Sequence, residues 1–212
     1  MKIAVIGAGN IGKVIISEAL SRGHQVTAVV RDPAKLTLSH AALSVTAGDV
    51  TDAASIAAAV AGHDAVVNAV GPNYAIGNID ILPQSVRTLI TALKQAGVAR
   101  LLVVGGAGSL EVAPGLRLYD TPDFPEAWRP SAKKHGEGLA LLRAETALEW
   151  TFFSPAAIIE PGQRTGTFRL GGDQLLADAA GNSRISIEDY AVAVVNELET
   201  PAHIRARFTI AY

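Results

Sequence analysis

Short apolar segments alternate with helical stretches through the first half of the chain, and this alternation limits the possible folds more than any other feature. The apolar runs of strand length are residues 3–6, 25–30, 43–47, 65–70 and 101–104. The segments between them carry apolar side chains at helical spacing, and glycines follow where these helices are expected to end. Strands that are apolar throughout and joined by helices form parallel sheets covered on both faces. The sequence therefore predicts an α/β fold, a Rossmann-type doubly wound parallel sheet.

The second half of the chain is less regular. We expect a proline-rich loop at 107–130, a helix at about 131–146 and a strand at 150–154. The glycine-rich stretch 162–185 is predicted to form a hairpin, and the last residues, 207–212, an edge strand. Between these two, Ser186 and Asp189 have the spacing of a helix capping box.

No linker or internal repeat divides the chain, so its 212 residues are predicted to form a single domain. Residues 1–106 would be a cofactor-binding core. Residues 107–212 would add the loop, hairpin, helix and strand that make a small C-terminal substrate-pocket extension.

The stretch GAGNIG directly follows the first strand and opens the first helix. In such a βαβ context, Gly7 permits a sharp turn, Gly9 leaves room for a pyrophosphate, and Gly12 lets helix and strand pack closely. The backbone at Asn10 and Ile11 would offer free N–H groups at the positive end of the helix dipole. This motif predicts a dinucleotide site rather than an ordinary glycine-rich turn.

The end of the second strand is where such folds read the adenosine ribose, and here it reads VVRDPAKL. An acid at this place favours NAD, whereas an arginine favours NADP. Asp32 precedes Pro33 and has a competing role as a helix cap. Arg31 follows the apolar run and Lys35 lies one turn later, so we expect NADP(H) as the preferred cofactor, with NAD(H) possible. A solvated surface charge is the alternative for Arg31.

Two further loops are predicted to line the cofactor. Asp49 and Val50 follow the third strand and would contact the adenine, and Ala69, Val70 and Gly71 follow the fourth strand and would run beside the ribose and pyrophosphate. Each could equally be an ordinary βα turn. All of them fall at the carboxyl edge of the predicted sheet, where doubly wound folds bind their ligands.

Composition excludes several classes of function. A formal net charge of −2 gives no basic surface for nucleic acid, and the absence of cysteine excludes disulfide and thiolate chemistry. Five scattered histidines do not suggest a metal site. The first apolar run ends too early for a signal peptide, and no apolar stretch is long enough to span a membrane. We expect a cytoplasmic protein, as a monomer or a homodimer, without a nucleic-acid or membrane partner.

These segments together resemble the short-chain dehydrogenase/reductase superfamily, and within it the atypical NAD(P)H-binding branch of NADH-flavin reductase, biliverdin reductase B-like and NmrA-like proteins. The resemblance rests on IAVIGAGNIG, VVRDPAKL, GDVTD and VVNAVG, and most specifically on the chain from Leu148 to Glu199. The first loop departs from the usual G-A-T/S-G-x-x-G. The Tyr-x-x-x-Lys pair of the main branch is missing, because no tyrosine here is followed four residues later by lysine.

The resemblance implies roles for residues around the expected nicotinamide. Ser109 stands where the superfamily places its catalytic serine, and His135 lies on the helix that normally carries the missing pair. Each also has a structural alternative, as a turn serine or a half-buried histidine. Gly105 and Gly106 would let the backbone approach the nicotinamide, and Pro155 would begin the far wall. The aromatic residues of 107–130 would form a lid or simply anchor the loop.

Three functions follow from these residues. Reduction of a flavin or quinone needs mainly two rings held face to face, so it tolerates the missing pair. A cofactor-binding redox sensor of the NmrA-like type also tolerates it. A sugar-nucleotide epimerase or dehydratase requires the absent tyrosine and ranks last.

Overall fold

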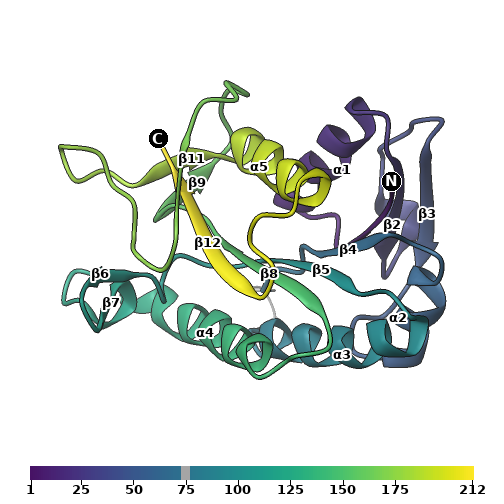
Figure 1. The fold of residues 1–212 in the computed structure, drawn as a ribbon, viewed down its shortest axis with the longest axis horizontal. Helices are drawn as coiled ribbons and strands as arrows, with labels where there is room; N and C mark the ends of the chain where they lie inside the picture. The colour runs from purple at the N-terminus through teal and green to yellow at the C-terminus, as the bar shows by residue number, and fades with distance from the viewer. Residues whose placement is uncertain (73–76) are drawn as a thin grey trace.

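The computed structural model describes residues 1–72 and 77–212 and contains one large sheet between two helical layers (Figure 1). The sheet has eight strands in the order β10-β12-β8-β5-β4-β1-β2-β3. These strands are β1 (Lys2–Ile6), β2 (Gln25–Val30), β3 (Leu43–Ala47), β4 (Ala65–Asn68), β5 (Arg100–Val104), β8 (Glu149–Ser154), β10 (Arg169–Gly171) and β12 (Ala206–Ala211). All neighbouring pairs are parallel except β10 with β12. The predicted α/β Rossmann-type fold is confirmed.

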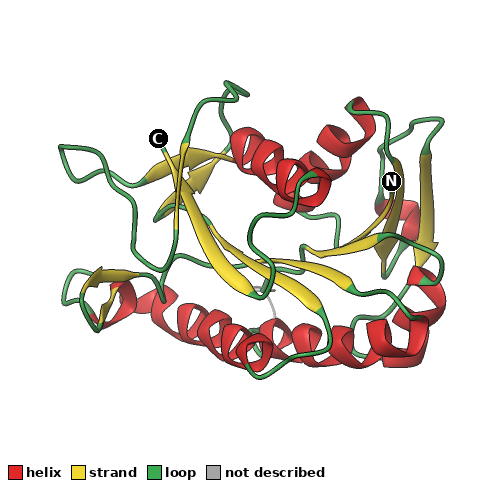
Figure 2. Ribbon diagram, in the orientation of Figure 1, coloured by secondary structure: helices red, strands yellow, loops and turns green. Residues whose placement is uncertain are grey.

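Within the described residues, five α-helices cover the two faces of the sheet (Figure 2). They are α1 (Asn10–Ser21), α2 (Ala53–Val60), α3 (Ile81–Ala96), α4 (Arg129–Arg143) and α5 (Ile187–Glu199). Helices α1 and α5 lie on one face, and α2, α3 and α4 on the other, each burying apolar side chains against the strands. Short turns of 3-10 helix occur at η1 (Pro33–Lys35), η3 (Leu118–Asp120) and η4 (Glu126–Trp128).

The order in which the chain adds strands to the sheet reverses between β1 and β4, and this reversal indicates where a ligand site is expected. From β1 the chain builds outward to β2 and β3, and then returns to β4 on the other side of β1. In doubly wound sheets, ligands bind in the crevice at the carboxyl ends of the strands at such a reversal. The turn at Gly7 and the loop after Asn68 leave the sheet at this point.

The C-terminal part differs from the sequence prediction in its strands. The segment 162–185 is not a hairpin, because β10 pairs with β12 while residues 173–175 bond to Glu111. With β10 outside it, β12 is not the edge strand. The predicted loop 107–130 contains a small antiparallel pair, β6 (Glu111–Ala113) with β7 (Leu116–Arg117). A second small pair joins β9 (Ile158–Glu160) to β11 (Arg184–Ser186) in parallel.

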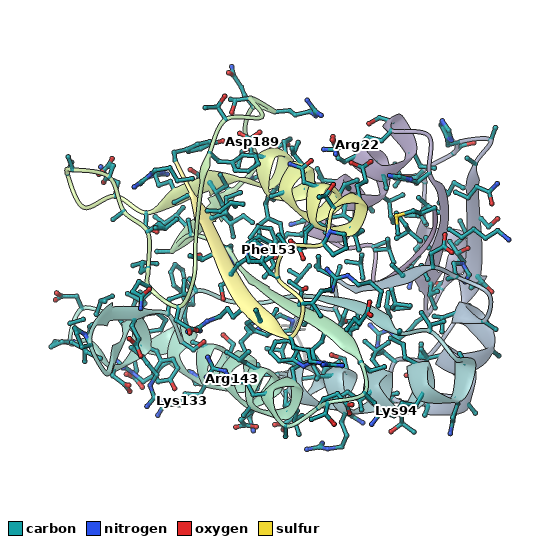
Figure 3. The ribbon with its side chains drawn as sticks, in the orientation of Figure 1. Arg22, Lys94, Lys133, Arg143, Phe153 and Asp189 are labelled. Carbon is teal, nitrogen blue, oxygen red and sulfur yellow. The ribbon has the colours of Figure 1, made fainter. Side chains whose placement is uncertain are left out.

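Helix ends were predicted with mixed success. The Asp52 carboxylate accepts bonds from the amides of Ala54 and Ser55, as a cap should. The Ser186 hydroxyl accepts from the amide of Asp189 and caps α5, but the Asp189 carboxylate does not complete a capping box. It accepts instead from Thr165, from the Gly166 amide and from the Tyr212 hydroxyl. Figure 3 labels Asp189 at the start of α5.

Helix α4 begins and ends earlier than predicted. Pro130 fits in its first turn because an amide hydrogen has no helical partner there. The fourth strand also ends earlier, at Asn68 rather than residue 70.

Candidate functional site

The turn after β1 adopts the conformation that its first glycine was predicted to allow. Gly7 has φ +92°, a left-handed value that L side chains rarely adopt. Its amide donates to the carbonyl of Val29 at 3.0 Å. A Cβ at this position would lie 3.0 Å from the carbonyl oxygen of Ala69. Gly7 is therefore required both by backbone conformation and by the close approach of the loop after β4.

The second and third glycines of the motif have opposite surroundings. A Cβ added to Gly12 would lie 2.1 Å from the carbonyl oxygen of Gly7, so the start of α1 rests directly on the turn. A Cβ added to Gly9 would meet no atom within 4 Å. The absence of a side chain at Gly9 leaves open space in front of the helix, as a pyrophosphate cradle requires.

The first turn of α1 offers hydrogen-bond donors without a competing acid. The first bond of the helix runs from the amide of Lys13 to the carbonyl of Gly9, which leaves the amides of Asn10, Ile11 and Gly12 without helical partners. The first turn has no acidic residue, and Gly9 provides no side-chain cap. These amides and the helix dipole fit an anionic diphosphate.

At the end of β2, the acid and the base behave differently. Asp32 accepts from the amide of Ala34 at 3.2 Å, and its other oxygen lies 3.2 Å from Nζ of Lys35. Asp32 therefore caps η1, the alternative role that its position before Pro33 suggested. Arg31 is exposed and has no ion pair with any residue that the structure describes. The predicted helper Lys35 is engaged by Asp32.

The loop after β3 is held by its own side chains. The carboxylate of Asp49 accepts from the amide and the hydroxyl of Thr51 at 2.9 and 2.7 Å. These bonds, with a smaller contribution from the nearby Arg31 charge, hold the pKa of Asp49 below its ordinary value. Val50 is buried in the core beneath the loop. The predicted adenine contacts at Asp49 and Val50 remain predictions, and the structure gives each residue a local structural role.

The loop after β4 lies against the glycine turn. The buried amide of Asn68 donates to the Ser85 hydroxyl at 3.0 Å and accepts from the amide of Val70 at 3.2 Å. Ala69 donates to the carbonyl of Ile6 at 2.9 Å, beside the turn at Gly7. Gly71 is exposed. The structure thus brings the predicted cofactor loops at 7–12 and 69–71 together at the reversal point.

The two glycines after β5 are needed because neighbouring side chains pack closely against their backbone. A Cβ on Gly105 would lie 2.3 Å from the ring of Phe152, and one on Gly106 would lie 2.9 Å from the ring of His135. The missing side chains therefore make room for Phe152 and His135. Close approach of this backbone to a nicotinamide on its other side stays a prediction. Pro155 is buried at the end of β8, and its carbonyl accepts from the Thr209 hydroxyl.

His135 lies in a small pocket that it shares with Asn68, Val70 and Phe152. Burial lowers the pKa of its imidazole to about 4, so the ring is neutral at neutral pH. It makes no hydrogen bond to a residue within 1–72 or 77–212. A neutral imidazole is a weak source of protons at pH 7, which limits its predicted role as proton donor.

Ser109 is the other predicted catalytic residue, and it has a partner that the sequence did not reveal. One guanidinium nitrogen of Arg207, Nη1, donates at 3.0 Å to both the hydroxyl and the carbonyl of Ser109. The guanidinium is in turn paired with Asp173. Arg207 sits within the last strand, ARFTIA, where an arginine among apolar neighbours was the available signal.

The aromatic residues of the loop at 107–130 were predicted either to form a lid or to anchor the loop. Tyr119 is buried, and burial raises the pKa of its phenol. Arg129 donates to the carbonyls of Tyr119 and Phe124 and so fixes this part of the loop. The Trp128 side chain is exposed to 55%. Tyr119 anchors the loop, and a lid role for the exposed Trp128 stays a prediction.

Comparisons with known proteins agree with this geometry. A family model described as NAD(P)H-binding matches residues 7–200. Three solved structures match the whole chain: a "putative exported protein" from Burkholderia pseudomallei (47% identity, TM-score 0.92, all of that chain), a "putative epimerase" from Bacteroides thetaiotaomicron (46%, 0.92, 96%) and a "putative NADH-flavin reductase" from Streptococcus pneumoniae (39%, 0.87, 99%). The family resemblance predicted from the sequence is confirmed, whereas the three names do not agree on an activity.

Proposed function

Since the chain belongs to the NAD(P)H-binding family and to the atypical short-chain dehydrogenase/reductase branch, we propose that this oxidoreductase passes a hydride from NADPH to a flat conjugated acceptor, a flavin or a quinone. The observation that carries the proposal is the open space at Gly9 beside amides that have no partners within the helix, in a chain that lacks the Tyr-x-x-x-Lys pair. The similar Streptococcus protein bears the name of an NADH-flavin reductase, which supports this acceptor class.

The residues of the chain bind and orient in this mechanism. The amides at 10–12 would hold the diphosphate, and the exposed Arg31 would pair with the 2′-phosphate of NADPH. The bound nicotinamide supplies the hydride. With His135 neutral and no tyrosine–lysine pair, the reduced acceptor would take its proton from water. Such a site suits an acceptor whose own electronics drive the reduction.

A second candidate is a redox sensor that binds the cofactor without turnover, and the missing pair favours it. The same pair is needed for sugar-nucleotide epimerisation, so we rank that function last although one similar structure is named an epimerase. The experiment follows NADPH and NADH oxidation after addition of FMN or a naphthoquinone, with calorimetry of both cofactors. Turnover supports the reductase, tight binding without turnover supports the sensor, and no binding of either cofactor refutes both.

Location and assembly belong to this proposal as well. None of the described helices combines the length and apolar character that crossing a bilayer requires. We propose a cytoplasmic protein, monomeric or homodimeric; the similar Burkholderia protein is named as exported, so cell fractionation is the decisive measurement. Size-exclusion chromatography with light scattering distinguishes the two assembly states.

A further inference from the structure

A buried cation lies beneath the loop that carries Ser109. Arg207 is on β12, opposite Phe152 of β8, and its side chain is only 4% exposed. Nη1 donates to Ser109, while Nε donates to the Asp173 carboxylate at 2.6 Å and Nη2 contacts the Asp173 carbonyl at 3.3 Å. Burial lowers the pKa of Arg207 and the Asp173 charge opposes this, but a guanidinium stays protonated in proteins. The positive charge is therefore permanent.

The segment that carries Asp173 is fixed in place by the backbone. The amide of Glu111 donates to the carbonyl of Asp173 at 2.9 Å, and the amide of Leu175 donates to the carbonyl of Glu111 at 2.8 Å. Arg143 of α4, labelled in Figure 3, is half-exposed and also donates to Asp173, at 3.0 Å. Arg207 thus joins three segments that are distant in sequence: the loop after β5, the stretch at 173–175 and β12.

The contact leaves the Ser109 proton available. A serine hydroxyl has one donor and two acceptor sites, and here an acceptor site is occupied by Arg207. No residue in the described part of the chain accepts the Ser109 proton. A hydrogen bond from a cation also polarises the hydroxyl and strengthens it as a donor.

Ser154 carries a second hydroxyl whose proton no described residue accepts, and it lies on the face of the sheet that Arg207 occupies. Side chains alternate along a strand, so Ser154 shares its face with Phe152, and Thr209 and Arg207 share the corresponding face of β12. The hydroxyl of Ser154 is fully buried and has no hydrogen-bond partner among the described residues. Ser154 is the last residue of β8, at the carboxyl edge where such folds bind ligands, and Arg207 lies near the start of the neighbouring β12 on the same face.

We propose that Arg207 is a positioning residue that holds and polarises the Ser109 hydroxyl, so that Ser109 donates to an acceptor oxygen that becomes negative on reduction. The inference rests on the proposed function and narrows its substrate to quinone-type carbonyl acceptors. Hydride transfer from NADPH to a neutral quinone gives NADP⁺ and the hydroquinone monoanion. The anion then takes a proton from water to give the hydroquinone. Ser109 stabilises the oxyanion through its hydrogen bond and transfers no proton.

The first test requires no turnover. 4-Nitrophenol, with NADP⁺ present, imitates the product complex, and the absorbance of its phenolate reports ionisation. The protein should bind the phenolate and lower the pKa of the bound phenol. Ser109→Ala and Arg207→Gln should each weaken phenolate binding at least about tenfold, the scale of one charge-assisted hydrogen bond, and Arg207→Lys should restore part of it. Arg143→Ala, which loses only the exposed contact to Asp173, should bind like the unaltered protein.

The second test compares two acceptors of different charge. A neutral naphthoquinone gains negative charge from hydride, whereas the cationic dye methylene blue becomes neutral. Arg207→Gln should lower kcat about tenfold or more with the quinone and leave kcat with the dye unchanged. Because Arg207 acts through Ser109, the double variant Arg207→Gln/Ser109→Ala should be no slower than the slower of the two single variants. Independent, multiplying losses overturn the inference.

The failures of the two proposals are distinguishable. If the unaltered protein fails to oxidise NADPH with every acceptor tested, the proposed function is refuted. The phenolate titration still tests the Arg207–Ser109 pair in that case. If Arg207→Gln does not fold, judged by circular dichroism and by NADP⁺ affinity, the comparison of Arg207→Lys with Ser109→Ala decides. An Arg207→Lys protein with unchanged phenolate affinity, beside an equally unaffected Ser109→Ala, overturns the inference.

Discussion

Replacing Gly9 by valine tests the cofactor site more directly than any other single change. The glycine has φ −75° and ψ −163°, an extended conformation that a β-branched residue adopts readily. No atom of the chain lies within 4 Å of the added Cβ. The fold should therefore tolerate the change, apart from about 1 kcal/mol for a poorer helix cap. The valine side chain would instead fill the space proposed for the diphosphate.

The expected loss of affinity follows from the donors that the valine would block. The amides at 10–12 have no partners within the helix, and each hydrogen bond to a charged phosphate contributes roughly 1.5–3 kcal/mol. Losing two of them removes about 3–6 kcal/mol, which weakens NADPH binding by roughly 10²- to 10⁴-fold. Isothermal calorimetry measures this, and thermal unfolding followed by circular dichroism should show a midpoint lowered by only about 2–4 °C.

Gly12→Ala is the matched comparison, because its added carbon would lie 2.1 Å from the carbonyl oxygen of Gly7. The helix must move away from the turn, and such overpacking costs about 1–3 kcal/mol or more. Gly12→Ala should therefore destabilise the protein, whereas Gly9→Val should mainly abolish binding. If Gly9→Val binds NADPH as tightly as the unaltered protein, the diphosphate does not lie at this turn and the reasoning fails.

Three other predictions concern single side chains. Arg31→Ser should weaken NADPH binding about tenfold and leave NADH binding unchanged in calorimetry, and an equal loss for both cofactors contradicts the proposed 2′-phosphate contact. Burial raises the pKa of Asp189, but hydrogen bonds from Thr165, Gly166 and Tyr212 outweigh burial and hold the pKa below its ordinary value. The ionised carboxylate therefore stabilises the fold above about pH 4, and this stability is lost as pH falls through the pKa of the folded state. Urea unfolding should show Asp189→Asn to be about 3 kcal/mol less stable at pH 7, with a free energy of unfolding that changes less as pH is lowered. The same pH dependence in Asp189→Asn and the unaltered protein contradicts this prediction. Burial lowers the pKa of His135 to about 4, so protonation of this residue favours the unfolded state as pH falls from about 6.5 to 4. The stability of His135→Leu should therefore fall less over that pH range than the stability of the unaltered protein. An equal loss of stability in both proteins would show that the imidazole is solvated.

Local chemistry explains why the first half of the chain was predictable. The turn at Gly7, the close contact at Gly12 and the cap at Asp52 depend on residues near in sequence, or on backbone conformations that only glycine adopts easily. The positions of β1, β4 and β5 follow from apolar runs that are buried on both faces. The role of Asp32 also followed, since Asp-Pro predicted a cap that the structure contains.

The second half was less predictable because its contacts are distant in sequence. Glycine-rich character at 162–185 suggested a hairpin, but the partner of β10 is the final strand, and residues 173–175 bond to Glu111. The contact between Arg207 and Ser109 spans 98 residues. No periodicity encodes such pairings, and the only trace in the sequence is a charged residue within an apolar strand. The proposed acceptor side of the site, to which we assign these contacts, was accordingly the part that the sequence left open.

The identity of the buried cation limits the chemistry that the site can perform. In the main branch of the superfamily, a tyrosine gives up its proton, and a lysine makes that loss easier. A guanidinium cannot lose its proton near neutral pH, and a serine hydroxyl is a far weaker acid than a phenol, so the Arg207–Ser109 pair can only lend a hydrogen bond. Simple ketones need a proton as the hydride arrives, because an isolated alkoxide is too basic to persist. A quinone does not, since its reduced anion is delocalised, and the arrangement therefore selects acceptors that can carry negative charge until water protonates them.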